Sequence, residues 1–238
     1  NAVQHRPVTP DSGTLTTRAK ITRIASSGGM IIQSYDFEIS DRHGPVYGGA
    51  TVFGFFSAEA LAQQVGVRDA QPYVPGPAEI ARGESFAYPE GAPFPEERLR
   101  MIDEIELYVA DGGPEGLGFV RGGKRVDPAE WFFDAHFYQD PVCPGSLGLE
   151  SFLQLLKVAA VRRWGGTADS VLETVAIGAK QSWNYRGQII RSNQKVTVEA
   201  VVTSVDDAGK LLKADGFLAV DGKVIYRMRD FSIRLRGD

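Results

Sequence analysis

Apolar residues are densest in one segment, and their pattern predicts a buried helix. From Ser146 to about residue 164 they occupy nearly the whole circumference of a helix rather than one face, until Gly165-Gly166 interrupts the pattern. Ser146 is a favourable N-cap residue, and Pro144-Gly145 predicts a turn before it. The aromatic run that begins at Trp131 predicts a strand leading into this turn. We therefore expect a central helix enclosed by other elements.

Alternating apolar and polar residues predict strands on both sides of this helix, separated by turns rich in glycine and aspartate. Before the helix the strand-like runs cover residues 14–25, 30–40, 46–56, 99–111 and 117–126, with a short helical turn at 57–65; after it they cover 171–190, 194–205, 211–220 and 224–235. Residues 98–238 are thus predicted to form one complete domain, in which strands precede and follow the helix.

The strands near the N-terminus repeat the pattern of those near the C-terminus. Aligning Ile21-Thr22-Arg23-Ile24 with Val202-Thr203-Ser204-Val205 places Gly28 on Gly209 and Phe37 on Leu218, and after a short insertion Gly44 meets Gly222. Residues 14–57 therefore resemble the C-terminal strands of a preceding repeat. We expect that repeat fragment to occupy residues 1–66, with residues 1–13 as a polar arm.

Residues 67–97 separate the two predicted domains. They contain six of the thirteen prolines, with glycines between them, and show no sustained periodicity. This composition predicts a linker or an extended segment draped over a neighbouring domain.

Composition excludes several classes of function. The chain is 43% hydrophobic and 24% charged, which is ordinary for a soluble globular protein, and its net charge of −4 provides no basic surface for nucleic acid. No apolar run approaches the ~20 residues that span a membrane, and no apolar signal core is present, so we expect a cytoplasmic protein. One cysteine and three scattered histidines predict neither an internal disulfide nor a metal cluster.

The segment 131–157 resembles the 3-hydroxyacyl-acyl carrier protein dehydratases of fatty acid synthesis. That family has a histidine, then D-P-x-x-P-G, then an acidic residue fourteen positions after the histidine, and His136, Asp140-Pro141, Pro144-Gly145 and Glu150 match these offsets. The segment is most similar to the decanoyl type, and closer still to the dehydratase domains of polyunsaturated fatty acid and polyketide synthases.

Two positions depart from the decanoyl-type pattern, because Glu150 stands where that branch has Asp and Cys143 where it usually has Met. Glu is typical of the sister branch that dehydrates without isomerising. The resemblance therefore implies a hydro-lyase and leaves isomerase activity open. It also implies an α+β hotdog fold, in which a curled antiparallel β-sheet wraps a long central helix, preceded here by the C-terminal strands of another hotdog.

Eliminating water from a 3-hydroxyacyl thioester requires a base for the C2 proton, an acid for the hydroxyl and a donor for the thioester oxygen. We assign His136 as the base, Glu150 as an acid kept protonated by its apolar helix, and the backbone N–H of Gly145 as the oxyanion donor. The resemblance implies that Gln154 orients Glu150. Expected substrate contacts are Phe137, Pro141, Cys143, Pro144 and Ser146.

The sequence predicts no cofactor of its own, because no glycine-rich phosphate loop links a strand to a helix. The resemblance implies a substrate carried on the phosphopantetheine arm of acyl carrier protein, other synthase domains as partners, and an active site shared between two hotdogs in a homodimer or pseudo-dimer. Two alternatives remain open: a non-catalytic acyl-binding or scaffolding repeat, and a hotdog thioesterase, although thioesterases place their carboxylate in other patterns.

Overall fold

A computed structural model describes residues 1–236 of the chain, which form two compact units. Unit 1 comprises residues 1–64 and 175–182, and unit 2 comprises residues 65–174 and the chain from Trp183 onward. Unit 2 contains the predicted central helix. Within residues 1–236, no helix is both long and apolar enough to cross a membrane.

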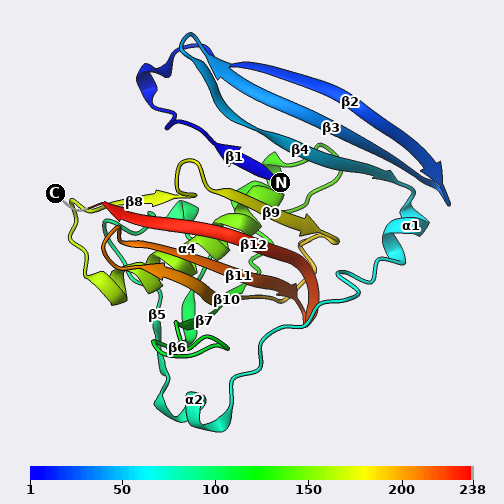
Figure 1. Cartoon of the computed structure of the whole chain (residues 1–238). Coiled ribbons are helices and arrows are strands. Elements are labelled where there is room, and N and C mark those ends of the chain that lie inside the picture. Colours follow the sequence, from blue (N-terminus) through cyan, green and yellow to red (C-terminus); the bar gives the residue numbers. More distant parts are fainter. Residues whose placement is uncertain (237–238) are drawn as a thin grey trace. The chain divides into compact units, whose positions relative to one another are not determined.

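Unit 1 is built on three long antiparallel strands (Figure 1): β2 (Thr16–Ser27), β3 (Met30–Asp41) and β4 (Gly44–Phe56). The helix α1 (Ala58–Ala62) follows them. The three strands and the helical turn confirm the alternation pattern. The predicted polar arm is partly wrong, because β1 (Ala2–Gln4) pairs with β4 and with the start of β9 (Lys180–Tyr185), and a 3-10 helix covers Pro10–Ser12.

Unit 2 contains one antiparallel sheet in the order β12-β11-β10-β7-β6-β5, with β8 paired to β12. Its strands are β5 (Glu84–Ala87), β6 (Glu104–Val109), β7 (Phe119–Arg125), β8 (Val171–Thr174), β10 (Lys195–Asp206), β11 (Leu211–Val220) and β12 (Lys223–Arg236). The single strand predicted for 171–190 is wrong, because turns interrupt it between β8 and β9.

The strands β2-β3-β4 reproduce the arrangement of β10-β11-β12, including two of its bulges. Thr22 is an extra residue on β2, and Thr203 is the extra residue at the matching place on β10. Val46 on β4 and Ile225 on β12 are likewise extra, and both side chains are buried. The two segments therefore share strand order and the positions of these two bulges.

The registers also correct part of the predicted alignment. Between the matched bulges, the β2–β3 hairpin is two residues longer than the β10–β11 hairpin. Phe37 therefore corresponds to Gly216 rather than Leu218, and Gly44 to Lys223 rather than Gly222. The shift at Phe37 is two residues and leaves that side chain on the same face, so alternation alone could not detect it, whereas the one-residue shift at Gly44 lies beside a turn.

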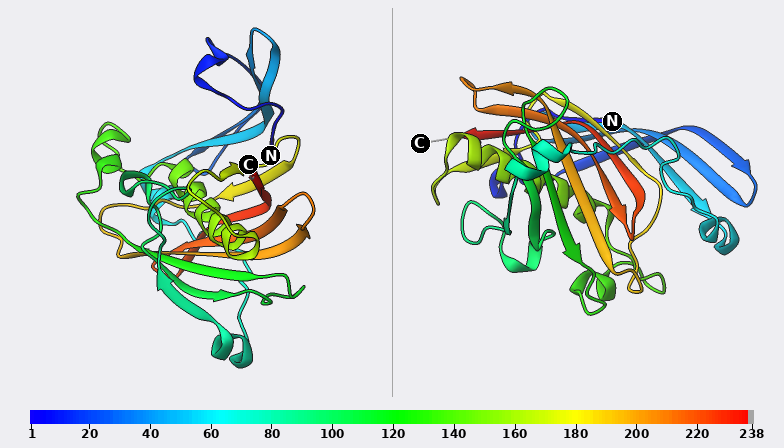
Figure 2. Two further views of the ribbon diagram at one scale, coloured as in Figure 1. Left: turned by 90° about the vertical axis from the view of Figure 1, so that its left-hand side faces the viewer. Right: turned by 90° about the horizontal axis from the view of Figure 1, so that it is seen from below.

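The long helix α4 (Gly145–Trp164) lies within the curl of the unit 2 sheet (Figure 2). Phe152, Leu155 and Leu156 are fully buried, as the apolar circumference predicted. Close packing depends on glycine at the contact points, since a Cβ on Gly148 would come within 2.6 Å of the Tyr226 hydroxyl oxygen. This arrangement confirms the hotdog architecture expected for the chain.

Two local predictions before α4 are wrong. The aromatic run is a short helix, α3 (Trp131–Ala135), because Phe132 and Phe133 both pack into the core and cannot do so from opposite faces of a strand. Ser146 lies inside α4, whose N-cap position is Pro144. The end of the helix at Trp164, before Gly165, agrees with the prediction.

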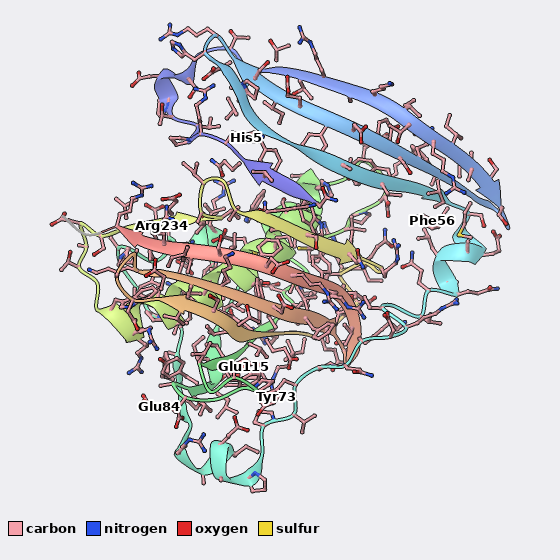
Figure 3. All side chains as sticks on the ribbon, in the orientation of Figure 1. His5, Phe56, Tyr73, Glu84, Glu115 and Arg234 are labelled. Carbon is pink, nitrogen blue, oxygen red and sulfur yellow. The ribbon has the colours of Figure 1, made fainter. Side chains whose placement is uncertain are left out.

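Residues 67–97 are largely extended but carry structure of their own. They include the helix α2 (Pro77–Arg82) and the strand β5, which pairs with β6, and a 3-10 helix follows at Glu97–Leu99. Tyr73 lies on the stretch between α1 and α2 (Figure 3), where its backbone N–H donates to Glu199 Oε1 at 3.0 Å. Burial raises the pKa of Glu199. This segment belongs to unit 2 and covers part of its sheet.

Replacing Gly216 with alanine should destabilise unit 2. The new methyl group would overlap the carbonyl oxygen of Glu199 and the ring of Phe152, and neither can move without disturbing β10 or α4. Overpacking of this kind costs about 1–3 kcal/mol of unfolding free energy. Thermal denaturation should show the loss, whereas Gly76→Ala, where the new Cβ makes only ordinary contacts, should melt like the parent. Equal melting of Gly216→Ala and the parent would contradict this packing.

Candidate active site

His136 lies where α3 ends, in a loop that fixes its ring. Its backbone N–H donates to Phe132 O at 2.9 Å, and its carbonyl oxygen accepts from Val142 N at 2.9 Å. Nδ1 lies 3.1 Å from Val142 O. Because a carbonyl oxygen only accepts, Nδ1 carries the hydrogen in this contact, and Nε2 of the neutral ring keeps its lone pair. The loop thus holds a histidine that can accept a proton at Nε2.

The predicted substrate contacts lie along this loop, in different environments. The ring of Phe137 stacks on the His136 ring with centroids 3.7 Å apart, and its side chain is 58% exposed. Pro141 and Ser146 are exposed, and Pro144 is half-buried. Cys143 is buried, which raises the pKa of its thiol to about 12, so it stays neutral and is a poor nucleophile. Contact of these residues with substrate stays a prediction.

Gly145 begins α4 beside two tyrosines. The hydroxyl of Tyr226 donates to Gly145 O at 3.2 Å, and the rings of Tyr226 and Tyr185 meet edge to face with centroids 4.6 Å apart. Burial raises the pKa of both hydroxyls, which keeps them protonated. The first N–H groups of a helix lack intrahelical acceptors. Within residues 1–236 no acceptor is found for the Gly145 N–H, so it is available to a developing oxyanion.

Glu150 is surrounded by donors rather than by the apolar groups that we expected. Its Oε1 accepts from Gln154 Nε2 at 3.1 Å and from Lys157 Nζ at 2.9 Å, and its side chain is 27% exposed. The expectation of an apolar environment around this carboxyl is therefore wrong. The sequence signal for Lys157 was its position seven residues, or two turns, after Glu150.

Gln154 links Glu150 to residues 99–101, the segment that precedes β6. It is fully buried, its Oε1 accepts from Met101 N at 2.9 Å, and its Nε2 also donates to Leu99 O at 2.9 Å. These bonds fix the amide, which donates to the Glu150 carboxyl from one direction. Its part in a reaction stays a prediction.

The two candidate catalytic groups belong to separate networks. Within residues 1–236, no hydrogen bond or ion pair joins His136 to Glu150. The structure therefore positions His136 and Glu150 through different partners. No group of three or more His, Cys, Asp or Glu side chains suited to a metal ion occurs in the described chain.

A model of the FabA-like domain matches residues 94–229, which is more than half of the chain. The chain belongs to the FabA-like domain family. A polyunsaturated fatty acid synthase subunit of Thraustochytrium sp. (strain ATCC 26185 / S-3) is 34% identical over 248 residues, covering 93% of this chain. This chain spans only 16% of that relative's length.

Two solved structures resemble the FabA-like chain over 99% of its length. The dehydratase domain from the CurJ module of Curacin polyketide synthase matches with a TM-score of 0.54 at 14% identity, over 73% of that chain. The tesB protein of Mycobacterium avium subs paratuberculosis matches with a TM-score of 0.52 at 12% identity, over 77% of that chain. At these identities the likeness establishes a shared fold and no activity.

A small cavity of about 30 Å³ lies beside α4 in this FabA-like domain. Its apolar walls come from Phe132, Phe133, Leu147, Ile189, Val196 and Leu218, and Cys143 also lines it. Lys124 and Glu130 form an ion pair of 2.8 Å in its lining, which the sequence did not indicate.

Proposed function

We propose that this chain dehydrates 3-hydroxyacyl thioesters to 2-enoyl thioesters in the synthesis of fatty acids, polyunsaturated fatty acids or polyketides. The observation that carries the proposal is the state of His136 within a FabA-like domain. Its Nδ1 is engaged by Val142 O, so its free Nε2 is ready to take a proton from the substrate.

In the proposed reaction, His136 Nε2 removes the C2 proton, and the electron pair of that C–H bond forms the C2–C3 double bond. The C3–O bond breaks, and the departing hydroxyl leaves as water after receiving a proton, which we assign to Glu150. Negative charge that develops on the thioester oxygen meets the N–H of Gly145 and the positive end of α4. No redox change occurs, and the proposed reaction needs no cofactor within the domain.

The proposed substrate is tethered to the phosphopantetheine arm of acyl carrier protein, and the proposed partners are the other domains of a multidomain synthase. The likeness of this chain to one segment of a polyunsaturated fatty acid synthase subunit supports both proposals. We further propose that a site is completed across a pair of hotdogs, as a homodimer or a pseudo-dimer. The separate networks of His136 and Glu150 support a shared site.

The test is to incubate the chain with 3-hydroxyacyl thioesters of acyl carrier protein, several chain lengths in parallel, and to follow enoyl absorbance together with thiol release. Dehydration predicts a rise in enoyl absorbance without free thiol. Thiol release without enoyl product would instead establish the thioesterase alternative. Binding with neither product would leave a scaffolding repeat, and 3-enoyl product would add isomerisation.

A further inference from the structure

Lys157 is a cation on α4 that the proposed reaction does not use. Glu150, Gln154 and Lys157 are spaced by four and three residues, so they share one face of the helix. The Lys157 side chain is only 12% exposed, and Glu150 is its one ion-pair partner within residues 1–236. A largely buried ammonium group requires such a partner, because leaving it unpaired is costly.

Both donors of this face converge on one carboxyl oxygen. Gln154 and Lys157 bind Oε1 of Glu150 at 3.1 Å and 2.9 Å, whereas Oε2 has no hydrogen-bond partner within residues 1–236. The carboxyl group is therefore fixed through one oxygen, and the other is free to meet a substrate hydroxyl. A surface ion pair on a helix would not immobilise the group in this way, because solvent and side-chain entropy compete with it.

We propose that Lys157 is a positioning residue, which clamps Glu150 through Oε1 and so holds Oε2 ready for the departing hydroxyl. This inference rests on the proposed function, in which Glu150 serves the departing hydroxyl. The apolar surroundings expected for Glu150 are replaced here by a direct bond from the Lys157 ammonium at 2.9 Å.

Two titratable groups outside α4 act near Glu150. Across from α4, the Tyr88 hydroxyl donates to Gln154 O at 3.3 Å, and burial, followed by the charge of Glu150, raises the pKa of Tyr88. Arg100 opposes that rise, and it is itself paired with Glu90 at 3.3 Å. Tyr88 is neutral and Arg100 has its own acid, so Lys157 supplies the dominant charge at the Glu150 carboxyl.

The first experiment measures kcat and KM of Lys157→Met, Lys157→Arg and the parent chain with a 3-hydroxyacyl-acyl carrier protein substrate. A misplaced carboxyl slows the chemical step without weakening substrate binding, so Lys157→Met should lower kcat by about 10–100-fold with KM unchanged. Lys157→Arg should restore most of kcat, because its guanidinium can also bind Oε1. Lys20→Met, which removes an exposed cation of unit 1, should keep both parental values.

The second experiment examines the same clamp without turnover. Crystal structures of the parent and of Lys157→Met are compared at Glu150, with Lys157→Gln as a second variant should the methionine chain fail to fold. The Glu150 carboxyl should occupy one orientation in the parent and several in the variant. A carboxyl that keeps the parental orientation in the variant, or a parental kcat in active Lys157→Met, would overturn the role of Lys157. An inactive parent chain would instead overturn the proposed function, while the structures still decide the role of the lysine.

Discussion

Replacing His136 with alanine should lower kcat for enoyl formation by about 10²–10⁴-fold, the usual contribution of a positioned acid–base group. The fold should survive, because the ring is half-exposed and its described contacts are Val142 O and the exposed ring of Phe137. The measurement is steady-state turnover, with a thermal melt of each protein to confirm equal folding.

His43→Ala is the matched control, since His43 is an exposed histidine in the turn between β3 and β4. Its variant should turn over at the parent rate. A His136→Ala protein that dehydrates like the parent would remove His136 from the mechanism. A variant that melts far below the parent would show that the residue acts on stability instead.

Activity should reappear when two inactive variants are combined. His136→Ala and Glu150→Gln chains, each inactive alone, are unfolded together and refolded as a mixture. In a two-fold dimer with shared sites, a mixed pair contains one site with both lesions and one site with neither. Random pairing makes about half of the dimers mixed, so about a quarter of all sites should recover.

The expected quarter of parental kcat is large against the residual rate of either variant. Parent chains carried through the same refolding set the full scale, and each variant refolded alone sets the baseline. Mixtures that stay at the baseline would show that each site is built within one chain. That outcome would remove the shared site and leave the chemistry of His136 and Glu150 untouched.

The sequence predicted the elements whose periodicity is long and regular. Helix α4 and the strands of both three-stranded segments were predicted because many residues repeat the same pattern. The helix α3 was mistaken for a strand because its aromatic residues favour strands, and its five residues are too few to show a helical period. Burial of Phe132 and Phe133, which only the folded structure reveals, determines its conformation.

The sequence indicated which residues are candidates for the site, but not which groups surround each of them. The motif singled out His136, Gly145 and Glu150, which lie at the end of α3 and on α4. The apolar composition of α4 nevertheless gave the wrong surroundings for Glu150, because composition does not tell which way the flexible side chain of Lys157 turns. The contact of Tyr226 with Gly145 joins residues 81 positions apart, which only the tertiary structure brings together.

The two-residue difference between the β2–β3 and β10–β11 hairpins limits how such sheets can vary in length. When an even number of residues is added or removed near a turn, each side chain of the next strand stays on the same face of the sheet. An odd change would turn that strand over and exchange its faces, unless a compensating bulge restored them. Natural variants of these hairpins are therefore expected to differ in steps of two, with odd steps accompanied by a displaced bulge.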